Sequence, residues 1–177
     1  MKEVSLSDVS RINPPKRAGL SRDLLCSFVP MEYVDDISGT ITQTSVRSVG
    51  EVEKGYTPFL NGDVIFAKIT PCMENGKCAI AQGMMNGVGF GSTEFHVLRA
   101  EHDVLPEWIY YFLRQEKIRQ QAARWFRGTA GQQRVPSDFL DQLKLPLPTI
   151  PEQRRLAAIL AKADRLRSLR RYANALG

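Results

Sequence analysis

The chain has 177 residues, with 24 lysines and arginines against 19 aspartates and glutamates, so its formal net charge is +5. Hydrophobic residues make up 43% and charged residues 24%, which is ordinary for a folded domain and excludes wholesale disorder. The apolar runs are strand-sized and the start of the chain has no apolar signal core, so we expect a cytoplasmic protein with no membrane span. Three cysteines in such a protein predict no disulfide framework.

Basic charge is concentrated in two late segments. Residues 114–134 hold six basic residues and one acidic residue, and residues 151–177 hold seven and two, so the rest of the chain is net acidic. This distribution is typical of a surface that faces a polyanion. Arginine-rich helices that are simply well solvated are the alternative that charge alone leaves open.

The first hundred residues predict mainly β-structure. Residues 4–9 predict a short strand followed by a capped helical turn, and the polar, proline-containing segment 13–19 predicts a loop. Alternating or apolar runs predict short strands at 28–31, 37–41, 64–70, 77–81 and 94–99. The glycine-rich stretch 83–91 predicts a loop or a tight turn.

The pattern becomes helical at Pro106. A helix with proline in its first turn is expected from there to about Phe126, then a flexible polar loop at 128–134 and a short helix capped by Ser137. Prolines at 146, 148 and 151 indicate a stiff connector. A last helix, from 152 to about 176, carries apolar residues at spacings of three and four: Leu156, Ile159, Leu160, Ala163, Leu166 and Leu169. The predicted fold class is mixed α+β, a twisted, mostly antiparallel sheet with flanking helices and one C-terminal amphipathic helix.

Motifs for catalysis are weak. Cys72, Cys78, His96 and His102 lack the ligand spacing of a zinc site, so no metal is expected. Residues 13–16 have the Asn-Pro-Pro start of the tetrad found in amino-methylating DNA methyltransferases, but a lysine replaces the aromatic residue, and no cofactor loop follows a strand. No clustered carboxylates resemble a metal-dependent nuclease core. The sequence therefore predicts a protein that is not an enzyme and needs no cofactor.

Features compatible with DNA binding lie around the polar loop. Arginines and aromatic residues alternate at 124–127, and the glycine-flanked loop that follows holds two glutamines and an arginine. Glutamine can pair with adenine and arginine with guanine in the major groove, and glycine lets the backbone approach phosphates. For Trp125 and Phe126 core packing is the favoured interpretation.

Five segments in order resemble a known family. They are GDVIFAKI at 62–69, GSTEFHVLR at 91–99, GTAGQQRV at 128–135, LPLP at 145–148 and PEQRRLAAIL at 151–160. Together they resemble a target recognition domain of the specificity (S) subunit of type I restriction-modification systems. A full specificity subunit carries two such domains and two long helices. This chain has one set, so a half subunit or a fragment is expected.

The resemblance implies a DNA-binding recognition domain at 1–148, which reads one half of a split site, and a conserved spacer and dimerisation helix at 149–177. It implies that the modification (methyltransferase) subunit and the restriction subunit are partners, that these partners carry out the catalysis, and that the last helix forms a coiled coil. Gly62, Asp63, Ser92, Thr93 and Phe95 are expected to be structural. The candidate DNA contacts are Arg47, Lys54, Lys68, Arg124, Arg127, Gln132, Gln133 and Arg134.

Two rival hypotheses stay open at this point. In the first, the chain is an assembly protein whose C-terminal helix docks a modification subunit and whose own DNA contacts are weak. In the second, it is a small nuclease or methyltransferase, which magnesium- or S-adenosylmethionine-dependent turnover would reveal.

Overall fold

A computed structural model describes residues 2–175, without the side chains of residues 168 and 171–175. Its strands are β1 (Lys2–Ser5), β2 (Ser10–Ile12), β3 (Leu25–Val29), β4 (Ser45–Ser48), β5 (Thr57–Leu60), β6 (Val64–Ala67), β7 (Cys78–Ile80), β8 (Val88–Gly91), β9 (Phe95–Ala100) and β10 (Lys144–Leu147). Its α-helices are α1 (Leu6–Val9), α2 (Val49–Val52), α3 (Cys72–Asn75), α4 (Pro106–Leu113), α5 (Glu116–Ala123), α6 (Ser137–Gln142) and α7 (Ile150–Ala175), and its 3-10 turns are η1 (Met31–Tyr33) and η2 (Met85–Gly87).

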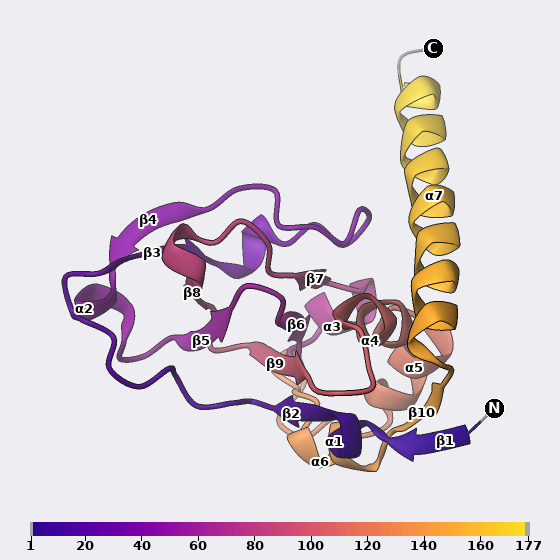
Figure 1. The fold of residues 1–177 in the computed structure, drawn as a ribbon, viewed down its shortest axis with the longest axis horizontal. Coiled ribbons are helices and arrows are strands. Elements are labelled where there is room, and N and C mark those ends of the chain that lie inside the picture. Colours follow the sequence, from indigo (N-terminus) through magenta and orange to yellow (C-terminus); the bar gives the residue numbers. More distant parts are fainter. Residues whose placement is uncertain (1, 176–177) are drawn as a thin grey trace.

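The strands form three sheets. Their orders are β1-β10, β2-β9-β6-β7 and β4-β3-β8-β5, and every pairing is antiparallel except that of β3 with β8. Figure 1 shows the third sheet and α2 at one end of the body, and α4, α5 and α7 at the other. The predicted mixed class with mainly antiparallel pairing is confirmed, with the strands divided among three sheets rather than one.

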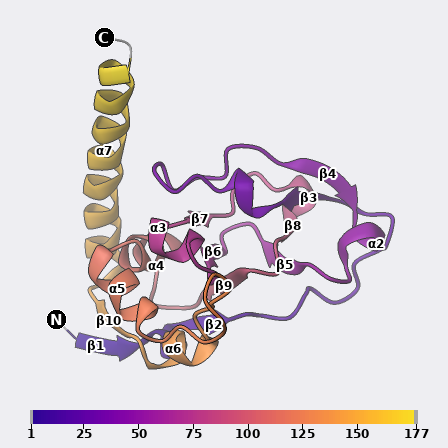
Figure 2. The ribbon, with the colours of Figure 1, turned by 180° about the vertical axis from the view of Figure 1, so that it is seen from behind.

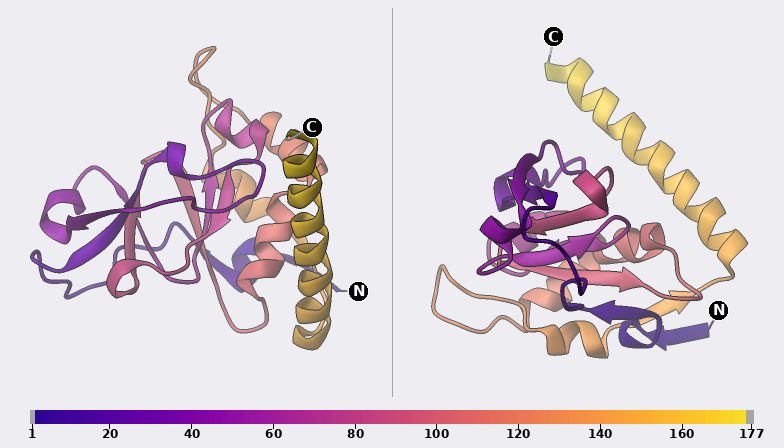
Figure 3. Two further views of the ribbon diagram at one scale, coloured as in Figure 1. Left: turned by 90° about the horizontal axis from the view of Figure 1, so that it is seen from above. Right: turned by 60° about the vertical axis from the view of Figure 1, so that its left-hand side comes forward.

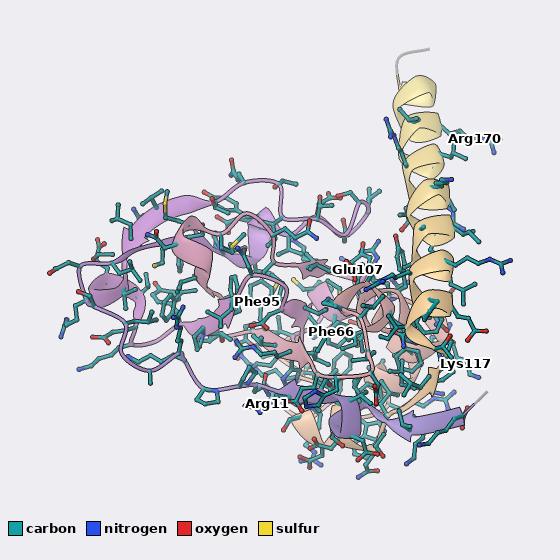
Figure 4. All side chains as sticks on the ribbon, in the orientation of Figure 1. Arg11, Phe66, Phe95, Glu107, Lys117 and Arg170 are labelled. Atoms are coloured by element: carbon teal, nitrogen blue, oxygen red, sulfur yellow. The ribbon has the colours of Figure 1, made fainter. Side chains whose placement is uncertain are left out.

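β6 is the centre of the body because both of its faces are buried. Val64 and Phe66 belong to the main core, which α4, α5 and α6 complete, whereas Ile65 belongs to a second core shared with β9 and β5. Figure 4 shows Phe66 and Phe95 inside the body, while Lys117 and Arg170 lie at its outside. The alternation predicted for 64–70 is confirmed for β6, although the strand ends at Ala67.

The predicted capped turn near the start of the chain is confirmed. The Ser5 backbone N–H donates to Asp8 Oδ2 at 3.1 Å, half of a capping box that begins α1. The predicted start of a helix at Pro106 and the long C-terminal helix are confirmed as well.

The prediction of a loop over 83–91 is wrong in its second half, because Val88–Gly91 is the strand β8 between β3 and β5. A Cβ at Gly89 would lie 2.1 Å from the Phe59 ring, and one at Gly91 would lie 2.4 Å from the Val29 carbonyl oxygen. Glycine is therefore needed here for close approach within a sheet rather than for a turn.

Other element predictions need correction. Residues 37–41 form no strand but a turn closed by a bridge between Val34 and Ile41. The helix expected over 106–126 is two helices, because Gln115 has an extended backbone between α4 and α5. Ser137 is the first residue of α6, which Pro136 precedes as N-cap.

The proline connector is also more regular than expected. Residues 144–147 form β10, in which Pro146 pairs with Glu3 of β1. Since β10 lies at the edge of a two-stranded sheet, the missing N–H of Pro146 is tolerated. Figure 2 shows β10 leading from α6 into α7.

Candidate nucleic-acid interface

The polar loop is an open hairpin that stands away from the body. Its stem is closed by Arg127 and Arg134, whose backbone groups exchange hydrogen bonds at 2.9 and 3.0 Å. Gly128 and Gly131 have φ of +117° and +81°, a region that L side chains rarely adopt. Figure 3 shows the loop projecting from the body in both views.

The stem is attached to the continuation of β6. The Val135 N–H donates to the Lys68 carbonyl at 2.8 Å, and the Thr70 N–H donates to the Gln133 carbonyl at 3.0 Å. Lys68 therefore lies beside the base of the loop, although it is 66 positions from Arg134 in the sequence. The fold thus brings the predicted Lys68 together with the predicted loop residues.

The loop and the adjoining end of α5 expose positive charge. Arg124 is exposed at the end of α5, and the exposed Arg127 makes an ion pair at 3.3 Å with the exposed Asp138. Ion pairs this open to water contribute little and exchange readily for other partners. Gln132 is exposed as well, and Gln133 is half-buried.

Arg134 is held more tightly than the other loop cations. Its Nε and Nη2 donate to the Glu94 carboxylate at 2.8 to 3.1 Å, and its Nη1 donates to the Gln132 carbonyl at 2.9 Å. Pairing with the Glu94 carboxylate raises the pKa of Arg134. Every guanidinium nitrogen of Arg134 therefore has a partner within the protein, and these bonds link the loop to Glu94, which directly precedes β9.

Two of the predicted DNA contacts lie elsewhere. Arg47 is on the edge strand β4, and Lys54 follows α2; both are exposed. Figure 1 shows these elements at the end of the body opposite to α7. The fold does not bring Arg47 and Lys54 next to the loop.

A buried histidine ties the loop stem to the sheet. The His96 ring lies against the Val135 carbonyl, 2.8 Å from its Nε2, and against the Asn13 side chain, 3.1 Å from its Nδ1. Asn13, at a φ of +49°, also accepts the Val97 N–H through its Oδ1. Burial lowers the pKa of His96 below its ordinary value of 6.5. Sequence reasoning considered both residues only for zinc and methyltransferase motifs and missed this clamp.

The clamp predicts that the stability of the domain depends on pH. The unfolded chain takes up a proton at this ring near pH 6.5, which the folded chain binds only at lower pH, so the free energy of unfolding falls as the pH drops from 7 to 5. The variant His96→Gln cannot titrate and should lack this component. Urea unfolding at several pH values measures it, and equal pH slopes for the two proteins would contradict the prediction.

The apolar residues predicted for the C-terminal helix are on α7, and most of them face water. Leu156 and Leu160 are partly exposed, and Ile159, Leu166 and Leu169 are more than half exposed. Ala163 is half-buried. Sequence reasoning missed the residue that fixes the base of this helix, Gln153, which is fully buried.

The side chains that could bind a metal ion do not cluster in the described part of the chain. Within residues 2–175, no group of three or more histidine, cysteine, aspartate or glutamate side chains could hold a metal ion. In the same part of the chain, no helix has the length and apolarity to cross a membrane. Cys26 and Cys78 are buried and Cys72 is half-buried, all as free thiols.

Comparison with known proteins identifies the family. Residues 1–174 match the family described as type I restriction modification DNA specificity domain. The chain is 36% identical over 160 residues to the type I restriction enzyme EcoEI specificity subunit and 35% identical over 154 residues to that of EcoAI, both from Escherichia coli. These matches cover 90% and 86% of the chain but 27% and 26% of the relatives, so the chain spans about a quarter of their length.

Solved structures agree with this result. The HsdS subunit from Thermoanaerobacter tengcongensis is similar with a TM-score of 0.72 and 26% identity, over 98% of this chain and 45% of that one. A chain from work on complex assembly and conformational transition of the type I R-M system has a TM-score of 0.75, again with 26% identity and with coverage of 98% and 45%. The ordered segments, the fold and the match over residues 1–174 lead to one conclusion: the chain belongs to the DNA specificity family of type I restriction-modification systems, with a single recognition domain.

Proposed function

We propose that this chain recognises one half of a split DNA target as the specificity component of a type I restriction-modification complex. The observation that carries the proposal is the exposed cationic loop, built on a domain that matches the specificity family over residues 1–174. Lys68, Arg124 and Arg127 would contact phosphates beside the loop, while Gln132 and Gln133 present amides that can read base edges.

The distal cations extend the proposed DNA-binding surface. Arg47 and Lys54 are exposed at the far end of the body, on β4 and after α2. We assign them phosphate contacts outside the region read by the loop. Because phosphate contacts release counterions, removing either charge should weaken binding to all sequences alike and lower its salt dependence.

The proposed partners are double-stranded DNA, the modification (methyltransferase) subunit and the restriction subunit of the same system. The chain itself would be non-catalytic and would need no cofactor, with methylation and cleavage carried out by these partners in the cytoplasm. Residues 1–148 would form the recognition domain and residues 149–177 the spacer helix. The exposed leucines and isoleucine of α7 support a helix interface in the assembled complex.

Selection from a randomised pool of DNA duplexes tests this function. The purified chain, with and without the modification subunit, should enrich one short motif, because base contacts from a fixed loop discriminate between sequences. The variant Arg127→Ala in the same complex tests the role of the loop, because it removes one of the proposed phosphate contacts and should weaken binding to the selected sequence. Binding to the winning sequence should weaken steeply with salt.

Enrichment of no motif in either condition would contradict the proposal and leave a basic assembly protein. In that case deletion of residues 151–177 should abolish capture of the modification subunit. Turnover by the isolated chain with magnesium or S-adenosylmethionine would instead identify a nuclease or a methyltransferase.

A further inference from the structure

The base of α7 is fixed by one buried amide. Gln153 accepts the Leu105 N–H at 2.9 Å through its Oε1, and its Nε2 donates to the carbonyls of Asp103 at 2.8 Å and Pro148 at 2.9 Å. The side chain is completely buried. It therefore joins the loop before α4 to the connector before α7, with every polar atom of the amide group bonded.

The connector itself is held by two neighbours. The indole N–H of Trp108 donates to the Pro146 carbonyl at 2.8 Å, and β10 pairs with β1. At the start of α7, the backbone N–H and the hydroxyl of Thr149 both donate to the Glu152 carboxylate, at 3.0 and 2.8 Å. The path of the chain into α7 is thus fixed by hydrogen bonds from the domain.

Further along, the helix is poorly packed against the domain. Ala157 is the last of the described side chains of α7 that is buried. A cleft of about 650 Å³ separates Leu160, Ala163 and Arg167 from α4 and α5, and another of about 380 Å³ runs between Ala158, Ala161 and α4. Figure 1 shows α7 rising from its base beyond the rest of the body. Close packing therefore does not set the direction of the helix above its first turns.

The helix amplifies any change at its base. About 22 residues follow Gln153 in α7, which at 1.5 Å per residue is a lever of roughly 33 Å. A tilt of about 10° would move the far end by roughly 6 Å. The rise of DNA is about 3.4 Å per base pair, so this tilt exceeds one base-pair step.

From this geometry we propose that Gln153 is a positioning residue that sets the angle between the recognition domain and α7, and thereby the separation of the two half-sites read by the assembled complex. The second part rests on the proposed function, because it requires α7 to be the spacer. Gln153 touches no DNA in this proposal and acts only through the direction of the helix.

The angle can be measured without DNA. Nitroxide labels at Gln82 and Arg165, both exposed, report the distance between the domain and α7 by pulsed electron paramagnetic resonance, with Cys72→Ser to remove the half-buried thiol. Gln153→Leu fills the buried position with an apolar side chain of similar size but leaves the backbone groups of Asp103, Leu105 and Pro148 without partners. The distance distribution should broaden or move by several ångström. An unchanged distribution would overturn the proposal.

A matched control separates this effect from general loss of stability. Val49→Ala removes a buried side chain of α2 at the opposite end of the body and should leave the distance distribution unchanged. If Gln153→Leu does not fold, Trp108→Phe removes the bond to Pro146 and part of the indole ring, keeps an aromatic side chain in place, and serves as the milder variant with the same expected broadening.

The consequence for DNA is tested in the complex with the modification subunit, by selection from duplexes with two random half-sites at varied separations. The wild type should select one separation, and Gln153→Leu should accept neighbouring separations while it keeps the half-site sequence. Equal separation preferences in both proteins would refute the assignment to half-site spacing. If the wild type enriches a half-site but no fixed separation, the assignment to half-site spacing fails. If it enriches no half-site at all, the proposed function fails, whereas the distance measurement still decides whether Gln153 sets the angle of α7.

Discussion

Replacement of Asp63 by alanine should lower the free energy of unfolding by about 3–5 kcal/mol, because it leaves a partly buried arginine without its counter-charge. Asp63 is 2% exposed and accepts both Nε and Nη2 of Arg99, at 2.8 and 2.7 Å. It also accepts the Leu60 N–H at 2.7 Å. The carboxylate thus joins the turn after β5 to β9, and pairing with it raises the pKa of Arg99.

Thermal unfolding measures the effect. At about 2–4 °C per kcal/mol for a chain of this size, the Tm of Asp63→Ala should fall by roughly 10 °C. Asp63→Asn keeps an acceptor for the Leu60 N–H, so its Tm should fall by less than that of Asp63→Ala. Arg127→Ala breaks an exposed ion pair with Asp138 and is the matched control, expected to change the Tm little. A Tm of Asp63→Ala equal to that of this control would contradict the prediction.

The structural role of Asp63 was predictable from the sequence, but its partner was not. Gly62 and Asp63 were expected to be structural, and a glycine directly before an apolar run is typical of a turn; Gly62 indeed has a φ of +88°. The ion pair with Arg99 spans 36 positions. Sequence position does not show which distant side chain a carboxylate will meet, since that depends on the pairing of β6 with β9.

Local patterns succeeded where one residue or one periodicity decides the structure. The capping box at Ser5, the proline that begins α4 and the alternation along β6 are of this kind. The prediction of a loop failed at β8, because glycine usually marks a turn, whereas Gly89 makes room for the Phe59 ring within the sheet. The break between α4 and α5 was also hidden, since both helices bury apolar residues at helical spacing.

At the candidate site, too, the sequence predicted local features but not contacts between residues that are far apart in the chain. Composition and the glycine-flanked motif identified the loop, and Lys68 proved to lie at its base. Arg47 and Lys54 were grouped with the loop by charge alone, and the fold places them at the end of the body opposite to α7, away from the loop. Glu94, which fixes Arg134, carried no signal of its own because its role depends on a contact across 40 positions.

Glu94 provides the sharpest test of how the loop acts on DNA. If the Glu94–Arg134 pair gives the loop its shape, Glu94→Ala and Arg134→Ala should each lower the affinity for the selected duplex about tenfold. This result would be informative because removing an acidic residue near DNA should by charge alone strengthen binding. The double variant should bind no worse than either single variant, since both break the same contact.

The salt dependence distinguishes loop shape from direct contact. Arg127→Ala, at an exposed cation with only a weak ion pair, should lower the slope of log affinity against log salt by about one, whereas Glu94→Ala should leave the slope unchanged. Fluorescence anisotropy titrations at several salt concentrations measure both. Tighter binding by Glu94→Ala, together with a reduced slope for Arg134→Ala, would show instead that Arg134 leaves its ion pair and binds the DNA itself. The two outcomes assign Arg134 either to the scaffold that presents the loop or to the surface that reads the target.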